Sequence, residues 1–268
     1  WHIFSRSSLR DHQFFYEIST IEAYSKLHDY SFVIVTIGND SSSDARCSSV
    51  RSIYFRRHCI VVEYLKHYDW ILFIDADVMV VNFNRCIEEF IDDQFDVIHY
   101  ERFFSAEVAA GGYLVKNSSF AQFYLTKWYE RHDEYGDMSF VNHDNGILQI
   151  HLLAYDTDVP REVIQRYEHH AYKLGRVKLV KPMHGWMRDG WITHLKWSDE
   201  DFILHGLITT DLAEFAAGWH TGGWTFLRLC PSLHSLKVTS SEREEMVKTA
   251  TRKMSFFNPF LYKERSKT

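Results

Sequence analysis

Short apolar runs alternate with longer segments of helical periodicity in the first part of the chain. Residues 31–38 form a run rich in β-branched side chains that ends at Gly-Asn-Asp, a pattern typical of a buried strand entering a loop. The Ser- and Asp-rich residues 39–49 continue that loop. From 50 to 67 the apolar positions recur at helical spacing, and the wholly apolar run Trp70-Ile71-Leu72-Phe73-Ile74 follows. A strand, a helix and a strand in this order indicate a βαβ unit and a parallel sheet covered by helices.

Short apolar runs and helical segments continue to alternate up to about residue 153. Beyond that, the hydrophobic positions show no clear period. We expect short strands over residues 95–100 and 111–116, and helices over 120–132 and 144–153. Residues 181–205 are rich in Gly, Trp and His without clear periodicity, which favours loops laid over a site. Neither a repeat nor a linker divides the chain. We therefore expect a single α/β domain over residues 1–268, with its core at about 30–210 and a C-terminal extension over 211–268.

Composition and charge narrow the class of protein. A chain of 268 residues with 46% hydrophobic side chains can bury a sizeable core. The formal net charge of -6 disfavours the clustered Lys and Arg of a nucleic-acid surface, so we expect no nucleic-acid partner. The sequence also lacks an apolar run of about 18 residues. We expect membrane attachment only through an N-terminal anchor upstream of Trp1.

Cysteines and glycosylation motifs bear on the compartment. Cys47, Cys59, Cys86 and Cys230 form no C-x-x-C pair, so two disulfides and four buried thiols are both compatible with the sequence. Asn39-Asp40-Ser41 and Asn117-Ser118-Ser119 have the form of N-glycosylation sites. Because such triplets also arise by chance, they give the luminal interpretation modest support.

Two carboxylates follow the most apolar strand of the chain. Asp75 and Asp77 come directly after Ile74, where a parallel sheet ends and where ligands of open α/β sheets bind. Oxygen ligands favour hard divalent cations such as Mg²⁺ or Mn²⁺. The simpler interpretation is that both residues only solvate a strand end, but unpaired charges beside an apolar strand are costly. The pair therefore predicts a metal site.

A second chemistry is compatible with the same pair. An apolar strand followed by Asp-x-Asp is also the first motif of haloacid-dehalogenase-like phosphatases, in which the first Asp is a nucleophile and the second an acid. Here Val78-Met79-Val80 follows the pair, and an expected strand and helix precede it. These features disfavour the phosphatase without excluding it.

A metal held by two carboxylates needs further ligands. His205 follows the short apolar run Phe202-Ile203-Leu204 and precedes Gly206, and His184 precedes Gly185. A lone His in such a place is more often structural than a ligand, but a distant residue or substrate phosphates must complete the shell. We expect His205 to complete it.

The order of these motifs resembles a known family. Residues 70–82, 110–117 (Ala-Gly-Gly-Tyr-Leu-Val-Lys-Asn), 143–146 (His-Asp-Asn-Gly), 184–186 and 201–206 together resemble a nematode-rich family of GT-A-type glycosyltransferases. That family is similar to the plant galactomannan galactosyltransferases and xyloglucan xylosyltransferases and, more distantly, to glycogenin-like enzymes. The resemblance spans about residues 30–210, and it implies a GT-A nucleotide-diphospho-sugar transferase fold with a mostly parallel central sheet flanked by helices.

The resemblance implies a role for each matching residue. Asp75-Ala76-Asp77 matches the Asp-x-Asp motif that holds Mn²⁺ (or Mg²⁺) against the donor diphosphate, and His205 matches the His that completes the coordination. Gly111 and Gly112 match the turn where backbone meets the donor sugar, since a glycine has no Cβ in the way.

The pair Asp144-Asn145 matches an Asp-Gln or Asp-Asn pair beside the transferring sugar, although an Asp at this place also caps helices.

Other side chains have two interpretations each. Arg56 and Arg57 could reach the diphosphate or base, or be solvated helix charges. Trp186, Trp191 and Trp197 are core or lid aromatics by default, and their position beside glycines leaves room for stacking on an acceptor.

The function that follows is an expectation. The resemblance implies a metal-dependent hexosyl- or pentosyltransferase that moves a sugar from a UDP-sugar donor to a glycan or other hydroxyl acceptor, with retention of configuration, in the lumen of the Golgi. A module that binds nucleotide sugar without turnover is the non-enzymatic alternative.

Overall fold

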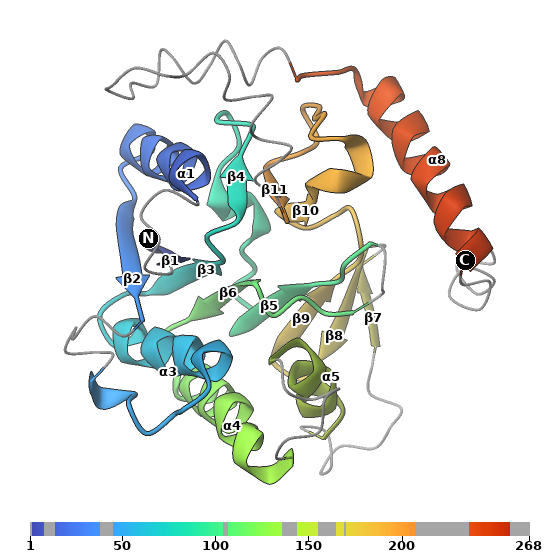
Figure 1. The fold of residues 1–268 in the computed structure, drawn as a ribbon. Coiled ribbons are helices and arrows are strands. Elements are labelled where there is room, and N and C mark those ends of the chain that lie inside the picture. Colours follow the sequence, from blue (N-terminus) through green and yellow to red (C-terminus); the bar gives the residue numbers. More distant parts are fainter. Residues whose placement is uncertain are drawn as a thin grey trace.

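The computed structural model describes residues 2–7, 14–37, 45–103, 107–135, 144–154, 165–168, 170–206 and 236–257. Its main element is an eight-stranded sheet with the strand order β2-β1-β3-β6-β5-β9-β8-β7 (Figure 1). The strands are β1 (His2–Ser7), β2 (Ser31–Thr36), β3 (Trp70–Ile74), β5 (Val97–Tyr100), β6 (Gly112–Lys116), β7 (Gln165–Glu168), β8 (Ala171–Leu174) and β9 (Val177–Val180).

Helices cover this sheet on both faces, as Figure 1 shows. One face packs against α3 (Ile53–Leu65), α4 (Ser119–Tyr135) and α5 (Asp144–Ala154), and the other against α1 (Phe15–Leu27) and a small second sheet. β3 shows why both faces are buried: Leu72 and Ile74 point into one core, and Ile71 and Phe73 into the other. The remaining described helices are η1 (Ile87–Phe90), η3 (Gly190–Thr193) and α8 (Ser240–Phe257).

The small sheet brings distant parts of the chain together. Its three strands are β4 (Val78–Val80), β10 (Met187–Asp189) and β11 (Ile203–His205), in the order β10-β11-β4. β11 runs antiparallel to β4, with His205 opposite Val78, and parallel to β10, with His205 opposite Asp189. The late part of the chain therefore reaches the end of β3.

Most long elements lie where the sequence predicts them. The helices expected over 50–67, 120–132 and 144–153 are α3, α4 and α5, and the strands expected around 31–38, 70–74, 95–100 and 111–116 are β2, β3, β5 and β6. Two details differ.

The first difference is strand direction. β1 is parallel to β2 and β3, and β5 is parallel to β9, but β6 runs antiparallel between β3 and β5. β8 is also antiparallel to both of its neighbours, β7 and β9. The sheet is thus mixed, whereas the sequence predicts a mostly parallel one, because an apolar strand buried on both faces has the same pattern in either direction.

The second difference concerns residues 181–205. The sequence predicts loops there, and the structure places the three-residue strands β10 and β11 among them. Strands this short leave no period to detect.

The structure shows the state of three of the four cysteines. Cys47 and Cys59 form a disulfide that joins the segment before α3 to the helix, and Cys86 is a free thiol. Cys230 and the Asn39 glycosylation triplet lie outside the described residues. None of the described helices combines the length and the apolar character that crossing a membrane requires.

Candidate functional site

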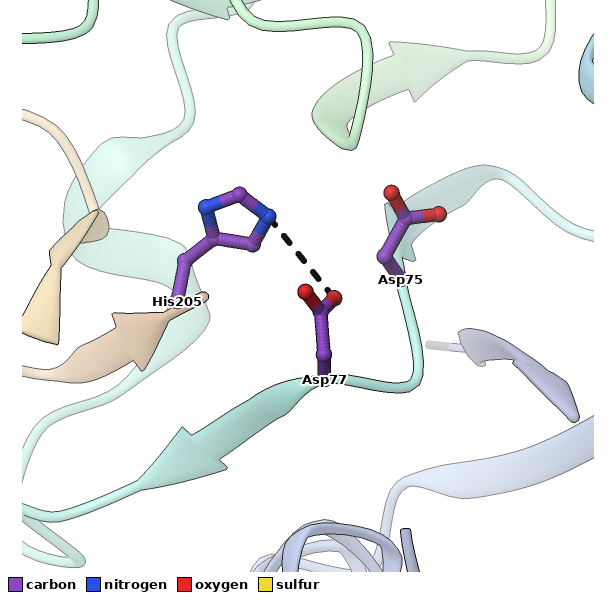
Figure 2. A group of neighbouring side chains, drawn as sticks. All are labelled: Asp75, Asp77 and His205. Atoms are coloured by element: carbon purple, nitrogen blue, oxygen red, sulfur yellow. Dashed lines mark ion pairs between the residues drawn. The ribbon is translucent and has the colours of Figure 1, made fainter. Parts of the chain in front are cut away.

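Asp75, Asp77 and His205 converge at the end of β3 (Figure 2). Each offers one ligand atom, and these three atoms lie within 4.8 Å of one another. The Nε2 atom of His205 is 3.7 Å from Oδ1 of Asp77. The structure thus brings together the three residues that the sequence predicts as metal ligands.

Backbone hydrogen bonds fix the turn between the two carboxylates. The N–H of Asp75 donates to the carbonyl of Gly111 at 2.9 Å, which extends the pairing of β3 with β6 by one residue. The N–H of Gly206 donates to the carbonyl of Asp77 at 3.1 Å. Ala76 is buried between them. Asp75 is therefore anchored to the large sheet and Asp77 to the small one.

Gly111 faces the cluster directly. A Cβ at this position would lie 2.6 Å from Oδ2 of Asp75 and 3.6 Å from Nε2 of His205. Any larger side chain would therefore displace a carboxylate oxygen or fill the space between the three groups. Gly112 does not face the cluster, since a Cβ there would meet the side chains of Met187 and Tyr100.

Arg57 links Asp75 to Asp144 beneath the cluster. Its guanidinium donates to Oδ1 of Asp75 and, through Nη2, to Oδ2 of Asp144, and its Nε reaches the same Asp144 oxygen at 2.8 Å. Asp144 is only 3% exposed. His58 adds a third donor, with Nε2 at 2.9 Å from that oxygen.

Burial and charge set the protonation states in this network. Burial alone would raise the pKa of Asp144, but the charge of Arg57 and the hydrogen bond from His58 outweigh it and lower the pKa to about 2. Burial lowers the pKa of His58 to about 4, so its imidazole is neutral at pH 7. Since a carboxylate can only accept, Nε2 carries the His58 proton, and Nδ1 accepts from the hydroxyl of Tyr113 at 3.0 Å.

Asp77 and His205 respond to each other as well as to burial. Burial raises the pKa of Asp77, the charge of His205 lowers it, the charge of Asp75 raises it, and the result is a raised pKa. Burial lowers the pKa of His205, but the hydrogen bond to Asp189 and the charge of Asp77 raise it above its ordinary value.

Two residues of α5 hold the segment that leads to Gly111. Oδ1 of Asn145 accepts from the N–H of Ala110 at 2.7 Å. One turn later, the amide of Gln149 both accepts from the N–H of Val108 at 3.1 Å and donates to its carbonyl at 2.9 Å. The side chain of Asn145 therefore supports the loop beside the carboxylates.

His205 is supported from the side opposite Asp77. Its Nδ1 lies 3.4 Å from Oδ1 of Asp189, and Arg102 donates to the same oxygen at 2.6 Å. Burial would raise the pKa of Asp189, but the hydrogen bonds from His205 and Arg102 lower it.

Several other predicted residues lie away from this cluster. Arg56 donates to the carbonyl of Val50 at 2.8 Å, in the loop before α3, whereas Arg57 points inward. His184 is exposed and stacks on His170 with ring centroids 4.9 Å apart.

The three tryptophans of this region differ in their exposure to solvent. Trp186 and Trp197 are core residues, and Trp191, in η3, is 40% exposed.

Three residues of the site are not apparent from the sequence: His58, Arg102 and Asp189. Each joins the site through a partner distant in the chain, so no local spacing indicates it. Buried Asp residues are rarely unpaired, but the burial of Asp189 and His58 is apparent only from the structure.

Known proteins share this fold. A glycosyltransferase involved in the glycosylation of the major capsid of PBCV-1 matches 88% of this chain and 100% of its own, with 15% identity and a TM-score of 0.50. The mixed sheet flanked by helices, with acidic side chains at the end of β3, is a GT-A-like fold. The chain belongs to the family described as protein of unknown function DUF273, whose model matches residues 21–169.

Two further comparisons are less informative. The glycosyltransferase GlyE of Streptococcus pneumoniae TIGR4, in its apo form, has 12% identity and a TM-score of 0.38 over 59% of this chain and 43% of its own, which is too low to define a common fold. Among curated proteins, no sequence matches this chain.

Proposed function

We propose that this chain is a metal-dependent glycosyltransferase. It would move a sugar from a UDP-sugar donor to a glycan or other hydroxyl acceptor, with UDP as the leaving group. The observation that carries the proposal is the convergence of Asp75, Asp77 and His205 within 4.8 Å at the end of β3, in a GT-A-like fold.

The three side chains suit a divalent cation. Oxygen ligands of Mg²⁺ lie about 2.0–2.1 Å from the ion, so ligand atoms within 4.8 Å of one another are close to the spread that one ion spans. Carboxylate oxygens with one imidazole are a donor set that Mn²⁺ and Mg²⁺ accept. When bound, such an ion would neutralise charge that develops on the departing diphosphate.

The surrounding residues of this chain would orient the site. Asp75, Asp77 and His205 would hold the ion, and Gly111, which has no Cβ, would keep the space next to Asp75 and His205 free of a side chain. Arg57 holds Asp75 in place and is itself held by Asp144. In this proposal Asp144 and Asn145 act by positioning Arg57 and the 108–111 segment, and any contact they make with the sugar remains a prediction.

The finer features rest on the resemblance of the sequence motifs. Similarity to the plant galactosyl- and xylosyltransferases and to glycogenin-like enzymes supports UDP as the nucleotide, a hexose or pentose as the transferred group, and retention of configuration.

Binding of UDP tests the proposal. We expect wild-type protein to bind UDP with Mn²⁺ in calorimetry, and Asp75→Asn and Asp77→Asn each to abolish this binding with the fold intact, because both side chains lie at the site and not in the core. Asp93→Asn is the matched control, since Asp93 is a surface residue paired with Lys116. His205→Ala should weaken Mn²⁺ binding, whereas His184→Ala should not.

The alternatives predict other outcomes. UDP binding unchanged in both Asp variants would overturn the metal site. Mg²⁺-dependent release of phosphate that is lost in Asp75→Asn and indifferent to nucleotide sugars would indicate the phosphatase. Binding of UDP-sugars without release of UDP, with or without acceptors, would indicate a non-catalytic binding module.

The compartment is a further part of the proposal. A disulfide such as Cys47–Cys59 persists in oxidising compartments, and Asn117 of the second glycosylation triplet is exposed. Both observations support the secretory lumen, and we propose the Golgi.

A further inference from the structure

His205 lies between two carboxylates that approach its two ring nitrogens. Nε2 faces Asp77 at 3.7 Å, within the candidate metal cluster, and Nδ1 faces Asp189 at 3.4 Å, outside it. β10 and β11 run side by side in parallel with Asp189 opposite His205, so the small sheet itself sets this pairing.

The chemistry of the two partners determines which nitrogen carries the proton. The carboxylate of Asp189 can only accept a hydrogen bond, so the nitrogen that faces it must be protonated. In the neutral imidazole the other nitrogen, Nε2, then has its lone pair directed at Asp75 and Asp77. A metal ligand needs that arrangement, and ligating histidines commonly obtain it from a carboxylate behind the ring.

The hydrogen bonding of Asp189 is unusual for a buried carboxylate. Its side chain is 1% exposed, and both His205 and Arg102 donate to the same oxygen, Oδ1. The second oxygen, Oδ2, is buried and has no hydrogen-bond partner among the residues that the structure describes. A carboxylate kept in such a place at this cost points to a role beyond packing.

We propose that Asp189 is the positioning residue of the metal site. It holds Nδ1 of His205 protonated and the ring in place so that Nε2 can bind the ion, while Arg102 fixes Asp189 in position. The inference rests on the proposed function for its metal, but the orientation of the ring and the site of its proton exist in the metal-free protein.

Substitution of Asp189 separates this role from packing. Asp189→Asn keeps an oxygen in reach of both His205 and Arg102 and places its amino group where Oδ2 has no partner. Asp189→Ala removes the acceptor. The matched control is Asp201→Asn, because Asp201 is equally buried next to the same sheet and is held by Arg188 at 2.6 Å and by Arg243.

The first measurement is the ¹⁵N NMR signature of the His205 imidazole in metal-free protein at pH 8, assigned by its loss in His205→Ala. We expect the Nδ1–H tautomer in wild type, Asp189→Asn and Asp201→Asn, and a mixed or inverted tautomer in Asp189→Ala. An unchanged tautomer in Asp189→Ala would overturn the inference, whether or not the protein binds a metal.

The second measurement is calorimetric titration with Mn²⁺ alone. We expect Asp189→Ala to weaken binding by about 10–100-fold, as loss of such outer partners does, and Asp189→Asn to weaken it less. Equal losses in Asp189→Ala and Asp201→Asn would show that Asp189 only supports the sheet. A wild-type protein that binds no Mn²⁺ would instead overturn the proposed function, and the NMR result would still decide the role of Asp189.

Discussion

Arg57 is a buried cation with a carboxylate on each side. It touches Asp75, which faces the candidate metal, and Asp144, which does not. The negative charge of Asp144 depends on this guanidinium and on the hydrogen bond from His58, because burial would otherwise raise the pKa of Asp144. Arg57 therefore links the stability of the core to the geometry of the site.

Loss of this cation should be costly. Arg57→Met would leave the buried Asp144 and the partly buried Asp75 without their shared cation, and we expect the free energy of unfolding to fall by about 3–5 kcal/mol in urea titrations. The neighbouring Arg56→Met is the control, since Arg56 donates to the carbonyls of Val50 and Ser48 in the preceding loop and not to Asp75 or Asp144, and its loss should cost about 1 kcal/mol. Equal losses of unfolding free energy in the two variants would contradict the proposed stabilisation of Asp144 and Asp75 by Arg57.

At the residue scale, the sequence predicts which residues lie in the site better than it predicts which side chains they contact. Asp75, Asp77, Gly111 and His205 meet as the order of motifs indicates. By contrast, the pairing of Arg57 with Asp144 depends on how α3 docks near α5, and the contact of His205 with Asp189 depends on the register of two three-residue strands. Neither docking nor register has a local signature.

At the scale of elements, the disulfide Cys47–Cys59 ties the middle of α3 to the segment that precedes the helix. That helix carries Arg57 and His58, so its position sets the support beneath Asp75. The bridge closes a short loop, with a sequence separation of 12.

Reduction of this bridge should lower stability. A loop of this length corresponds to about 3 kcal/mol in the chain-entropy model, and we expect a loss of that order in urea unfolding with dithiothreitol present. Cys47→Ser/Cys59→Ser should match the reduced protein and be insensitive to the reductant. Sensitivity that persists in the double variant would assign the effect to other cysteines.

Elements differ in how well the sequence predicts them. α3, α4 and α5 show their period over three or more turns, and β3 is wholly apolar, so all four are evident. β4, β10 and β11 have three residues each and are stabilised by one another, with Thr20 of α1 accepting from the N–H of Val80 at 3.0 Å. Tertiary contacts, and not local propensity, define them.

At the scale of the whole molecule, the core between the sheet and α3, α4 and α5 contains three buried histidines. Burial lowers the pKa of His58 to about 4, of His99 to about 3 and of His151 to about 3. All three are neutral in the folded protein at pH 5–7, whereas an unfolded chain protonates them near pH 6.5. Their contribution to stability is fully present above pH 6.5 and is lost as the pH falls toward 4.

Acid should therefore destabilise the fold at pH values well above those at which ordinary carboxylates take up protons. Glu17 opposes the histidines, because burial raises its pKa to about 7, so the net excess in the unfolded state is one to two protons. We expect the free energy of unfolding to fall by about 1.4–3 kcal/mol per pH unit near pH 5.5, measured by urea titration. His99→Asn should remove about one proton from this difference and so reduce the slope by about 1.4 kcal/mol per pH unit. A flat profile between pH 7 and 5 would contradict the buried neutral histidines.

The overall architecture is predictable where the chain alternates regularly and less so where it does not. The α/β class follows from the first βαβ pattern, and the GT-A-like fold follows from the order of motifs. Strand direction beyond β3 does not, since Leu114 and Val115 of β6 would be equally apolar in either orientation.

The small sheet has a consequence for synthesis of the protein. Arg57 precedes Asp75 and Asp77 along the chain, but His205 follows them by about 130 residues. At about 5–20 residues per second, the ribosome needs on the order of ten seconds to add that stretch. For most of this interval the nascent chain has both acids and Arg57 but neither the imidazole of His205 nor Asp189. A site that needs His205 could therefore form only after most of the large sheet has been synthesised.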